Sequence, residues 1–148
     1  MNWSICLIIA VFIWNVDCQT RPVRKYKVKE NPSGAKPQSG DRVIVHYTGN
    51  LKGVNNTIGT KFDSSRDRND PFRFTLFKGE VISGWDIAVN SMRVGDRAWF
   101  DIPSDLAYGP NGSPPAIPRN ADLLFDIELL GIEPRPAPNQ ASAQNGLL

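Results

Sequence analysis

One stretch of the chain carries apolar residues at the spacing of an α-helix. They recur three and four positions apart, so that successive turns present them on one side: Ile82, Trp85, Val89 and Met92. This spacing predicts a short helix from Ser83 to Met92. The Ser83 side chain is expected to cap its first turn, and Gly95 to close its end.

Other stretches alternate apolar with polar residues, a pattern typical of strands with one buried face. They are Arg24–Glu30, Arg42–Thr48, Lys61–Ser65, Phe72–Leu76, Arg97–Ile102 and Leu123–Leu129. Lysines alternate along the first, which favours an exposed edge strand. Asp101 is expected to face outward, opposite the apolar Ala98 and Phe100. A lone helix among strands predicts an α+β fold, in which the helix lies across the concave face of a sheet and Trp85 packs between them.

Two long loops are expected between these strands. Gly49–Thr60 is polar and punctuated by glycines, which predicts a long hairpin loop. Ser104–Asn120 is rich in proline and can form neither a strand nor a helix. Long irregular loops inside compact domains are usually functional, so the second loop is expected to contribute to a site.

Length and composition restrict the class of protein. The chain has 148 residues, 41% of them hydrophobic and 22% charged, which suits one soluble domain. Its net charge is +2, and basic residues alternate with acidic ones around Arg66–Asp70, so no nucleic-acid partner is expected. Beyond Glu133 the sequence is rich in proline and small or polar residues, which predicts a disordered tail over 134–148.

The first eighteen residues differ in kind from the rest. Ile5–Trp14 is an uninterrupted apolar run of ten, too short to span a bilayer but as long as the core of a signal peptide. We therefore expect a signal peptide over 1–18 and a mature domain over 19–133, without Cys6 and Cys18. The expected location is outside the cell or in the lumen of the endoplasmic reticulum, with no stable membrane association after cleavage. An uncleaved anchor is the alternative.

The chemistry open to the mature chain is narrow. It has one histidine, His46, no cysteine, no carboxylate cluster at metal-ligand spacing and no glycine-rich phosphate loop, so neither a metal nor a cofactor is expected. Aromatic residues are plentiful, and several converging on the helix would leave an apolar pocket with a few polar groups at its rim. Rotation about a prolyl peptide bond suits such a pocket because it needs no nucleophile, although amide resonance imposes a barrier of about 18–20 kcal/mol.

A series of motifs in order along the chain resembles one family. They are His46-Tyr-Thr-Gly, Lys61-Phe-Asp-Ser-Ser-Arg-Asp-Arg-Asn, Pro71-Phe, Glu80-Val-Ile-Ser-Gly-Trp-Asp, Val94-Gly-Asp-Arg-Ala, Leu106-Ala-Tyr-Gly and Leu124-Phe-Asp-Ile-Glu-Leu-Leu. From about Val23 to Glu133 the chain closely resembles the FKBP-type peptidyl-prolyl cis-trans isomerases, immunophilins that bind tacrolimus and rapamycin. The resemblance implies a five- or six-stranded antiparallel sheet wrapped around one short α-helix. Its implied partners are proline-containing peptides, unfolded proteins and macrolide ligands.

The resemblance also implies a set of site residues. A ligand or substrate would contact Tyr47, Phe62, Asp63, Arg68, Phe72, Phe74, Glu80, Val81, Ile82, Trp85, Tyr108, Ile117 and Phe125. The catalytic residues implied are Asp63, Trp85, Tyr108 and Phe125. Trp85 would form the floor of the pocket, the backbone around Glu80 and Ile82 would hydrogen-bond the ligand, and Tyr108 would donate to a ligand carbonyl.

The sequence departs from the family pattern near the expected pocket. Ser113 stands where some members have a histidine, and Ala116 replaces a bulkier aliphatic residue, so substrate choice is expected to change more than activity. The loop over 50–61 is longer than in the shortest members.

The expected function is a peptidyl-prolyl cis-trans isomerase that assists folding in the secretory pathway. Two other functions stay open: a non-catalytic binding module that uses the same pocket, and a secreted effector. Two sequons, at Asn55 and Asn111, are glycosylation candidates if the chain enters that pathway. The ending Asn145-Gly-Leu-Leu favours export over retention, and a monomer is expected.

Overall fold

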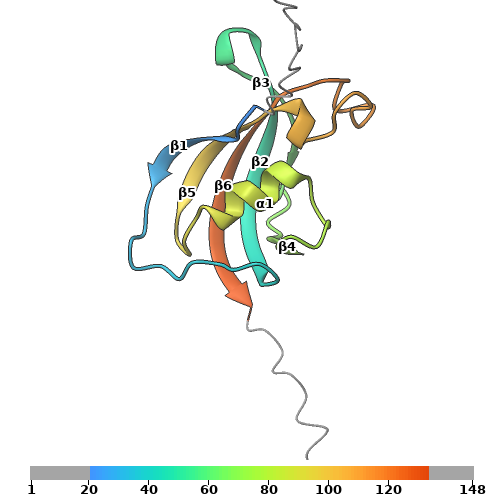
Figure 1. Ribbon diagram of the computed structural model, residues 1–148. Helices are drawn as coiled ribbons and strands as arrows, with labels where there is room; N and C mark the ends of the chain where they lie inside the picture. The colour runs from blue at the N-terminus through green and yellow to red at the C-terminus, as the bar shows by residue number, and fades with distance from the viewer. Residues whose placement is uncertain (1–20, 134–148) are drawn as a thin grey trace, which may run out of the picture.

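The computed structural model describes residues 21–133, which form an antiparallel sheet and one α-helix (Figure 1). The strands are β1 Arg24–Lys29, β2 Arg42–Lys52, β3 Ile58–Ser64, β4 Phe72–Thr75, β5 Arg97–Ile102 and β6 Leu123–Glu133. The helix α1 spans Ser83–Asn90, and two short 3-10 turns are η1 Val54–Asn56 and η2 Ser104–Leu106. The signal peptide expected over 1–18 and the tail expected over 134–148 lie outside the described residues.

The six strands form one sheet in the order β1-β5-β6-β2-β3, and β4 also pairs with β2. β2 pairs with β6 along one edge, and its other edge is shared by β4 near its start and β3 near its end. α1 lies across the concave face of the curved sheet in Figure 1. The expected α+β architecture is confirmed, and β1 is the edge strand that its lysines predicted.

The hydrophobic core lies between α1 and the sheet. Alternate residues of β2, β5 and β6 point toward the helix. Trp85 and Val89 of the helix, and Met92 just after it, are buried against them. Burial of large apolar side chains from both layers is the main force that holds the helix on the sheet. The helical spacing in the sequence therefore predicted the buried face correctly.

The ends of α1 differ from the prediction. Ser83 is the first helical residue rather than the cap, because Ile82 occupies the N-cap position and no side chain caps the turn. The helix also ends earlier, at Asn90, and Gly95 lies in a separate turn before β5, with φ of 90°. Apolar spacing extended the prediction to Met92, but Met92 is buried from a tight turn after the helix.

The connection between β2 and β3 is also shorter than predicted. β2 continues to Lys52 and β3 begins at Ile58, so that the strands meet in a tight turn around η1 rather than in a long loop. Gly49 and Gly59, which suggested a loop, lie within paired strands. Asn55 and Asn56 make the turn with positive φ angles of 56° and 62°, which asparagine tolerates better than most residues.

Asp101 faces outward as predicted, but it is not exposed to solvent. It points away from α1, yet only 5% of it is exposed, because the Lys52 ammonium lies 2.7 Å from its carboxylate and covers it. Within 21–133, no helix is long and apolar enough to cross a membrane, and no three potential metal-binding side chains gather in one place.

Candidate active site

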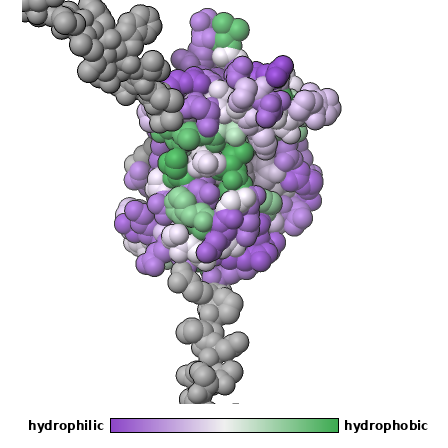
Figure 2. Space-filling model, turned by 45° about the vertical axis from the view of Figure 1, so that its right-hand side comes forward, coloured by the Kyte–Doolittle hydropathy of each residue, from purple (hydrophilic) through white to green (hydrophobic). Residues whose placement is uncertain are grey.

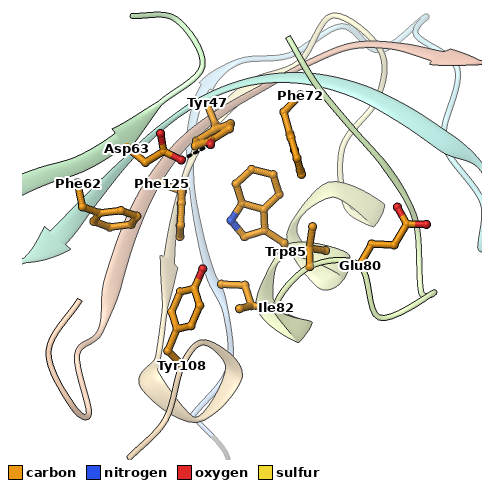
Figure 3. A pocket seen from close by; sticks show the side chains of 10 residues that line it. Tyr47, Phe62, Asp63, Phe72, Glu80, Ile82, Trp85, Tyr108 and Phe125 are labelled. Carbon is orange, nitrogen blue, oxygen red and sulfur yellow. Dashed lines mark hydrogen bonds between the residues drawn. The ribbon is translucent and has the colours of Figure 1, made fainter. Parts of the chain in front are cut away.

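A cavity of about 170 Å³ opens between the start of α1 and the sheet, with room for a prolyl ring. Figure 2 shows apolar residues gathered in the middle of the face turned to the viewer, within a polar surround. The residues that line the cavity are Tyr47, Phe62, Asp63, Phe72, Glu80, Val81, Ile82, Trp85, Tyr108 and Phe125 (Figure 3). They come from four strands, from α1 and from the loops that precede α1 and follow η2.

The Trp85 indole stands at the centre of this group (Figure 3). Its ring centroid lies 4.9 Å from that of Tyr47 and 5.2 Å from that of Phe125, both in edge-to-face geometry. Phe72 and Phe74 approach it at 5.8 and 5.7 Å. Such edge-to-face contacts fix ring orientations beyond what burial alone would do. The floor of the cavity is therefore rigid and apolar.

The polar side of the cavity is a network of three residues. The Tyr47 hydroxyl and the Arg68 guanidinium both donate to the Asp63 carboxylate, one to each oxygen. Arg68 also donates to the Tyr47 hydroxyl at 3.2 Å. Each carboxylate oxygen of Asp63 thus accepts a hydrogen bond from a side chain of this protein.

The pKa values in this network follow from those contacts. Burial is the largest influence on Asp63 and raises its pKa, but the hydrogen bonds from Tyr47 and Arg68 outweigh it, so that its pKa lies below the usual range. Burial raises the pKa of Tyr47, and the hydrogen bond to Asp63 raises it further. At neutral pH the pair is therefore a carboxylate and a phenol, neither of which is poised for proton transfer.

The wall opposite this network is the loop that leads into α1. Ile82 is the N-cap residue of the helix, and its carbonyl accepts the Trp85 N–H at 2.9 Å. The Ile82 N–H donates to no acceptor within 21–133. The Glu80 carboxylate points away from the rings in Figure 3, because its Oε2 accepts the Thr75 N–H at 2.9 Å. A backbone donor, rather than the Glu80 side chain, is what this wall offers to a ligand.

Tyr108 closes the cavity from the loop after η2. The residue is 40% exposed, and its ring reaches over the cavity mouth in Figure 3. Its hydroxyl has no hydrogen-bond partner among the described residues and is therefore available to a ligand.

Comparison with known proteins gives the family. A family model for the FKBP-type peptidyl-prolyl cis-trans isomerases matches residues 33–130. The chain belongs to this family. It is 55% identical over 97 residues to the peptidyl-prolyl cis-trans isomerase Fkbp12 of Drosophila melanogaster, which covers 66% of this chain and 85% of that one. It is 48% identical over 101 residues to FK506-binding protein 1A of Aspergillus fumigatus, covering 68% and 86%.

A longer relative shares the same domain. The chain is 50% identical over 111 residues to the peptidyl-prolyl cis-trans isomerase FKBP4 of Mus musculus, covering 75% of this chain but only 23% of that protein. The similarity to FKBP4 therefore concerns one part of that relative, whereas the two shorter FKBP proteins match over most of their length.

The FKBP resemblance placed most of the site residues at the cavity. Three of those it implied do not line it. Arg68 stands behind Asp63 and Tyr47, and Phe74 lies behind Trp85 and Phe72. Ile117 is a buried residue of the proline-rich loop and pairs with Ser113 of the same loop in an isolated bridge. These three support the FKBP cavity rather than line it.

Two motif residues whose roles the sequence did not reveal, Gly49 and Asp86, shape the FKBP cavity. A Cβ atom on Gly49 would lie 2.7 Å from ring carbons of Phe62 and Phe125, so only glycine lets both rings reach the cavity. Asp86 is buried in α1 and accepts the Phe77 N–H at 2.8 Å, which ties the Glu80–Ile82 wall to the helix. A glycine inside an alternating strand could have indicated the close approach at Gly49, whereas the motif that ends at Asp86 did not reveal its hydrogen bond to Phe77.

Proposed function

We propose that this peptidyl-prolyl cis-trans isomerase acts at the cavity around Trp85, on Xaa-Pro bonds of unfolded or newly translocated chains in the secretory pathway. The reaction, cis-trans isomerisation of prolyl bonds, follows from membership of the family. The observation that supports the location is an apolar, aromatic cavity with free donors on two sides and a polar network whose members are already paired.

The reaction breaks no covalent bond, so the cavity acts by preferring one geometry of the amide. Planar peptide bonds resist rotation by about 18–20 kcal/mol because rotation interrupts amide resonance. The twisted amide has a less polar carbonyl, so rings that exclude water favour it over the planar ground state. In this proposal the prolyl ring rests on Trp85, between Tyr47, Phe72 and Phe125.

The free donors orient the substrate. The Ile82 N–H and the Tyr108 hydroxyl flank the cavity and have no partner among the described residues, so both can donate to substrate carbonyls as the amide rotates. Asp63 stays ionised and hydrogen-bonded, so its role is to hold Tyr47 and Arg68 in place. No step of this proposal transfers a proton.

The secretory location is supported by the apolar run Ile5–Trp14, which has the length of a signal-peptide core. Macrolide ligands are proposed for the same cavity because FK506-binding protein 1A, a relative at 48% identity, is named for such a ligand.

The test is the rate of cis-to-trans conversion of a proline tetrapeptide with Leu or Phe before the proline, measured for residues 19–148 with and without rapamycin. We expect acceleration that rapamycin abolishes. Acceleration that survives saturating rapamycin would place catalysis outside this cavity. Rapamycin binding without acceleration would favour the non-catalytic binding module.

A further inference from the structure

The loop that carries Tyr108 is anchored at its two ends by residues outside the cavity. We call Ser104, Asp105 and Asp122 the loop base, since the loop leaves β5 through the first two and returns to β6 at the third. Asp122 joins the ends, because its Oδ1 accepts the Ser104 N–H at 3.0 Å. Its carbonyl accepts the Lys52 N–H at 2.9 Å, which ties the loop base to β2.

Arg21 binds this loop base from the segment that precedes β1. Its Nη1 and Nη2 donate to the two carboxylate oxygens of Asp122 at 2.7 and 2.8 Å. Nη2 also lies 3.4 Å from Ser104 Oγ and 3.5 Å from the Asp105 carboxylate. In Figure 1 the blue start of the described chain lies beside the orange loop. A bidentate guanidinium–carboxylate pair fixes orientation as well as distance.

The charge state of Asp122 suits this contact. Burial is the largest influence and raises its pKa, but hydrogen bonds from Arg21 and the Ser104 N–H outweigh it, so that its pKa lies below the usual range. The carboxylate is therefore ionised at neutral pH and accepts from both residues at once.

The loop base connects directly to Tyr108. The Ser104 carbonyl accepts the Ala107 N–H at 3.0 Å and the Gly109 N–H at 2.8 Å, and these two residues flank Tyr108. Tyr108 is 40% exposed, so packing alone restrains its side chain little. The position of Ser104 therefore sets where the ring stands over the cavity.

We propose that Arg21 is a positioning residue for the isomerase site: it clamps the loop base from the amino-terminal segment and thereby holds Tyr108 over the cavity. The inference rests on the proposed function, because it assumes that Tyr108 acts at that cavity. Arg21 itself does not line the cavity.

The test compares R21A with R24A in residues 19–148, which contain the whole core. Arg24 is an exposed arginine three positions later, with no ion pair to any described residue, so R24A removes the same charge. An exposed bidentate ion pair contributes up to about 1 kcal/mol, so we expect R21A to speed amide exchange at Ala107 and Gly109 roughly two- to fivefold. Amides of β6 should exchange at the wild-type rate in both variants.

Activity gives the second readout. We expect R21A to lower kcat/KM for the proline tetrapeptide by about two- to fivefold and R24A to leave it unchanged. In a Tyr108→Ala background the loss from R21A should disappear, because the residue that it positions is gone. A chain that starts at Pro22 should behave like R21A.

Three results would overturn the proposal: unchanged exchange at Ala107 and Gly109, an equal loss of activity in R24A, or an undiminished effect of R21A in the Y108A background. Amide exchange at Ala107 and Gly109 tests whether Arg21 holds the loop base, and this test does not depend on isomerase activity. A wild-type protein that does not accelerate isomerisation would refute the proposed function, while the exchange comparison would still decide whether Arg21 holds the loop.

Discussion

The two tyrosine hydroxyls at the cavity differ in what they can do for a substrate. Tyr47 donates to Asp63, so a substrate carbonyl would have to compete with a carboxylate for its proton. Tyr108 has no partner among the described residues. A hydrogen bond formed only when the substrate is bound can favour the rotating amide, whereas one already made within the protein cannot. At the scale of single residues, we therefore propose Tyr108 as the hydroxyl that acts on the substrate.

Removing the Tyr108 hydroxyl tests this assignment. We expect Tyr108→Phe to lower kcat/KM for a proline tetrapeptide by about two- to tenfold, the range of one hydrogen bond. The melting temperature should stay unchanged, because the hydroxyl bonds nothing in the described structure. Tyr26→Phe on β1 is the matched control, since Tyr26 is also exposed but lies away from the cavity. Equal activities of the two variants would refute the role of Tyr108.

Asp63 predicts a pH dependence of stability. Its folded-state pKa lies below the unfolded value of about 3.9, so its contribution is present above that value and is lost as the pH falls through the folded pKa. We expect D63N to be less stable than wild type at pH 7, with a difference that begins to shrink below about pH 4 and is lost below the folded-state pKa. Because 41% of the side chain is exposed, solvent screening should keep the difference under about 1 kcal/mol.

Urea unfolding of both proteins between pH 7 and pH 3 measures this difference. Asp70→Asn is the control, because Asp70 is exposed and forms no ion pair with a described residue. A D63N difference that stays constant down to pH 3 would show that Asp63 is not held as an ionised partner of Arg68.

At the scale of elements, burial patterns were predictable and boundaries were not. Alternation in β2 and β6 and the three- and four-residue spacing in α1 follow directly from which side chains are buried, and the sequence carries that information. The β2–β3 connection was mispredicted because glycines suggest turns, whereas Gly49 serves a close approach of two rings from other strands. The burial of Asp101 was not predictable, because the residue that covers it, Lys52, comes from a distant strand. Such contacts depend on the tertiary structure, which local patterns do not reveal.

The candidate site likewise combines features that local sequence reveals with features that depend on the tertiary structure. Family motifs placed the cavity residues, because the motifs are local and the elements carry them to one place. The role of Asp86 could not be seen, since it depends on a hydrogen bond to the Phe77 N–H of a neighbouring loop. Strand and helix patterns gave the scaffold of the cavity, and tertiary hydrogen bonds gave its shape.

The glycine in β2 provides the test at this scale. In Gly49→Ala the new methyl group would lie 2.7 Å from ring carbons of Phe62 and Phe125, so both rings must move. Overpacking of this kind costs about 1–3 kcal/mol, and we expect that loss in the free energy of unfolding together with weaker rapamycin binding. Gly131→Ala in β6 is the control, because its Cβ would meet only Ile44, at 3.9 Å. Similar losses in both variants would contradict the close approach at Gly49.

At the scale of the whole molecule, we propose that the amino-terminal segment links export to the site. In the proposal that residues 1–18 are removed, Arg21 becomes the third residue of the mature chain, close to a free terminus. The clamp on the loop base would then depend on how far trimming proceeds. Cleavage after Arg21 would remove the guanidinium and leave the core intact, because the core begins beyond it.

Translocation tests the secretory proposal. Translated with microsomes, the precursor should become protease-protected and begin at Gln19, whereas a full-length chain that stays protease-accessible would refute export.

Asn55 is exposed at the β2–β3 turn and does not line the cavity, so a glycan there should leave kcat/KM unchanged. Asn111 is exposed in the loop that carries Tyr108, so a glycan there should hinder substrates. Endoglycosidase treatment of N55Q and N111Q separates the effects of the two glycans. Removing the glycan should raise the activity of N55Q, which keeps Asn111, and should leave the activity of N111Q unchanged.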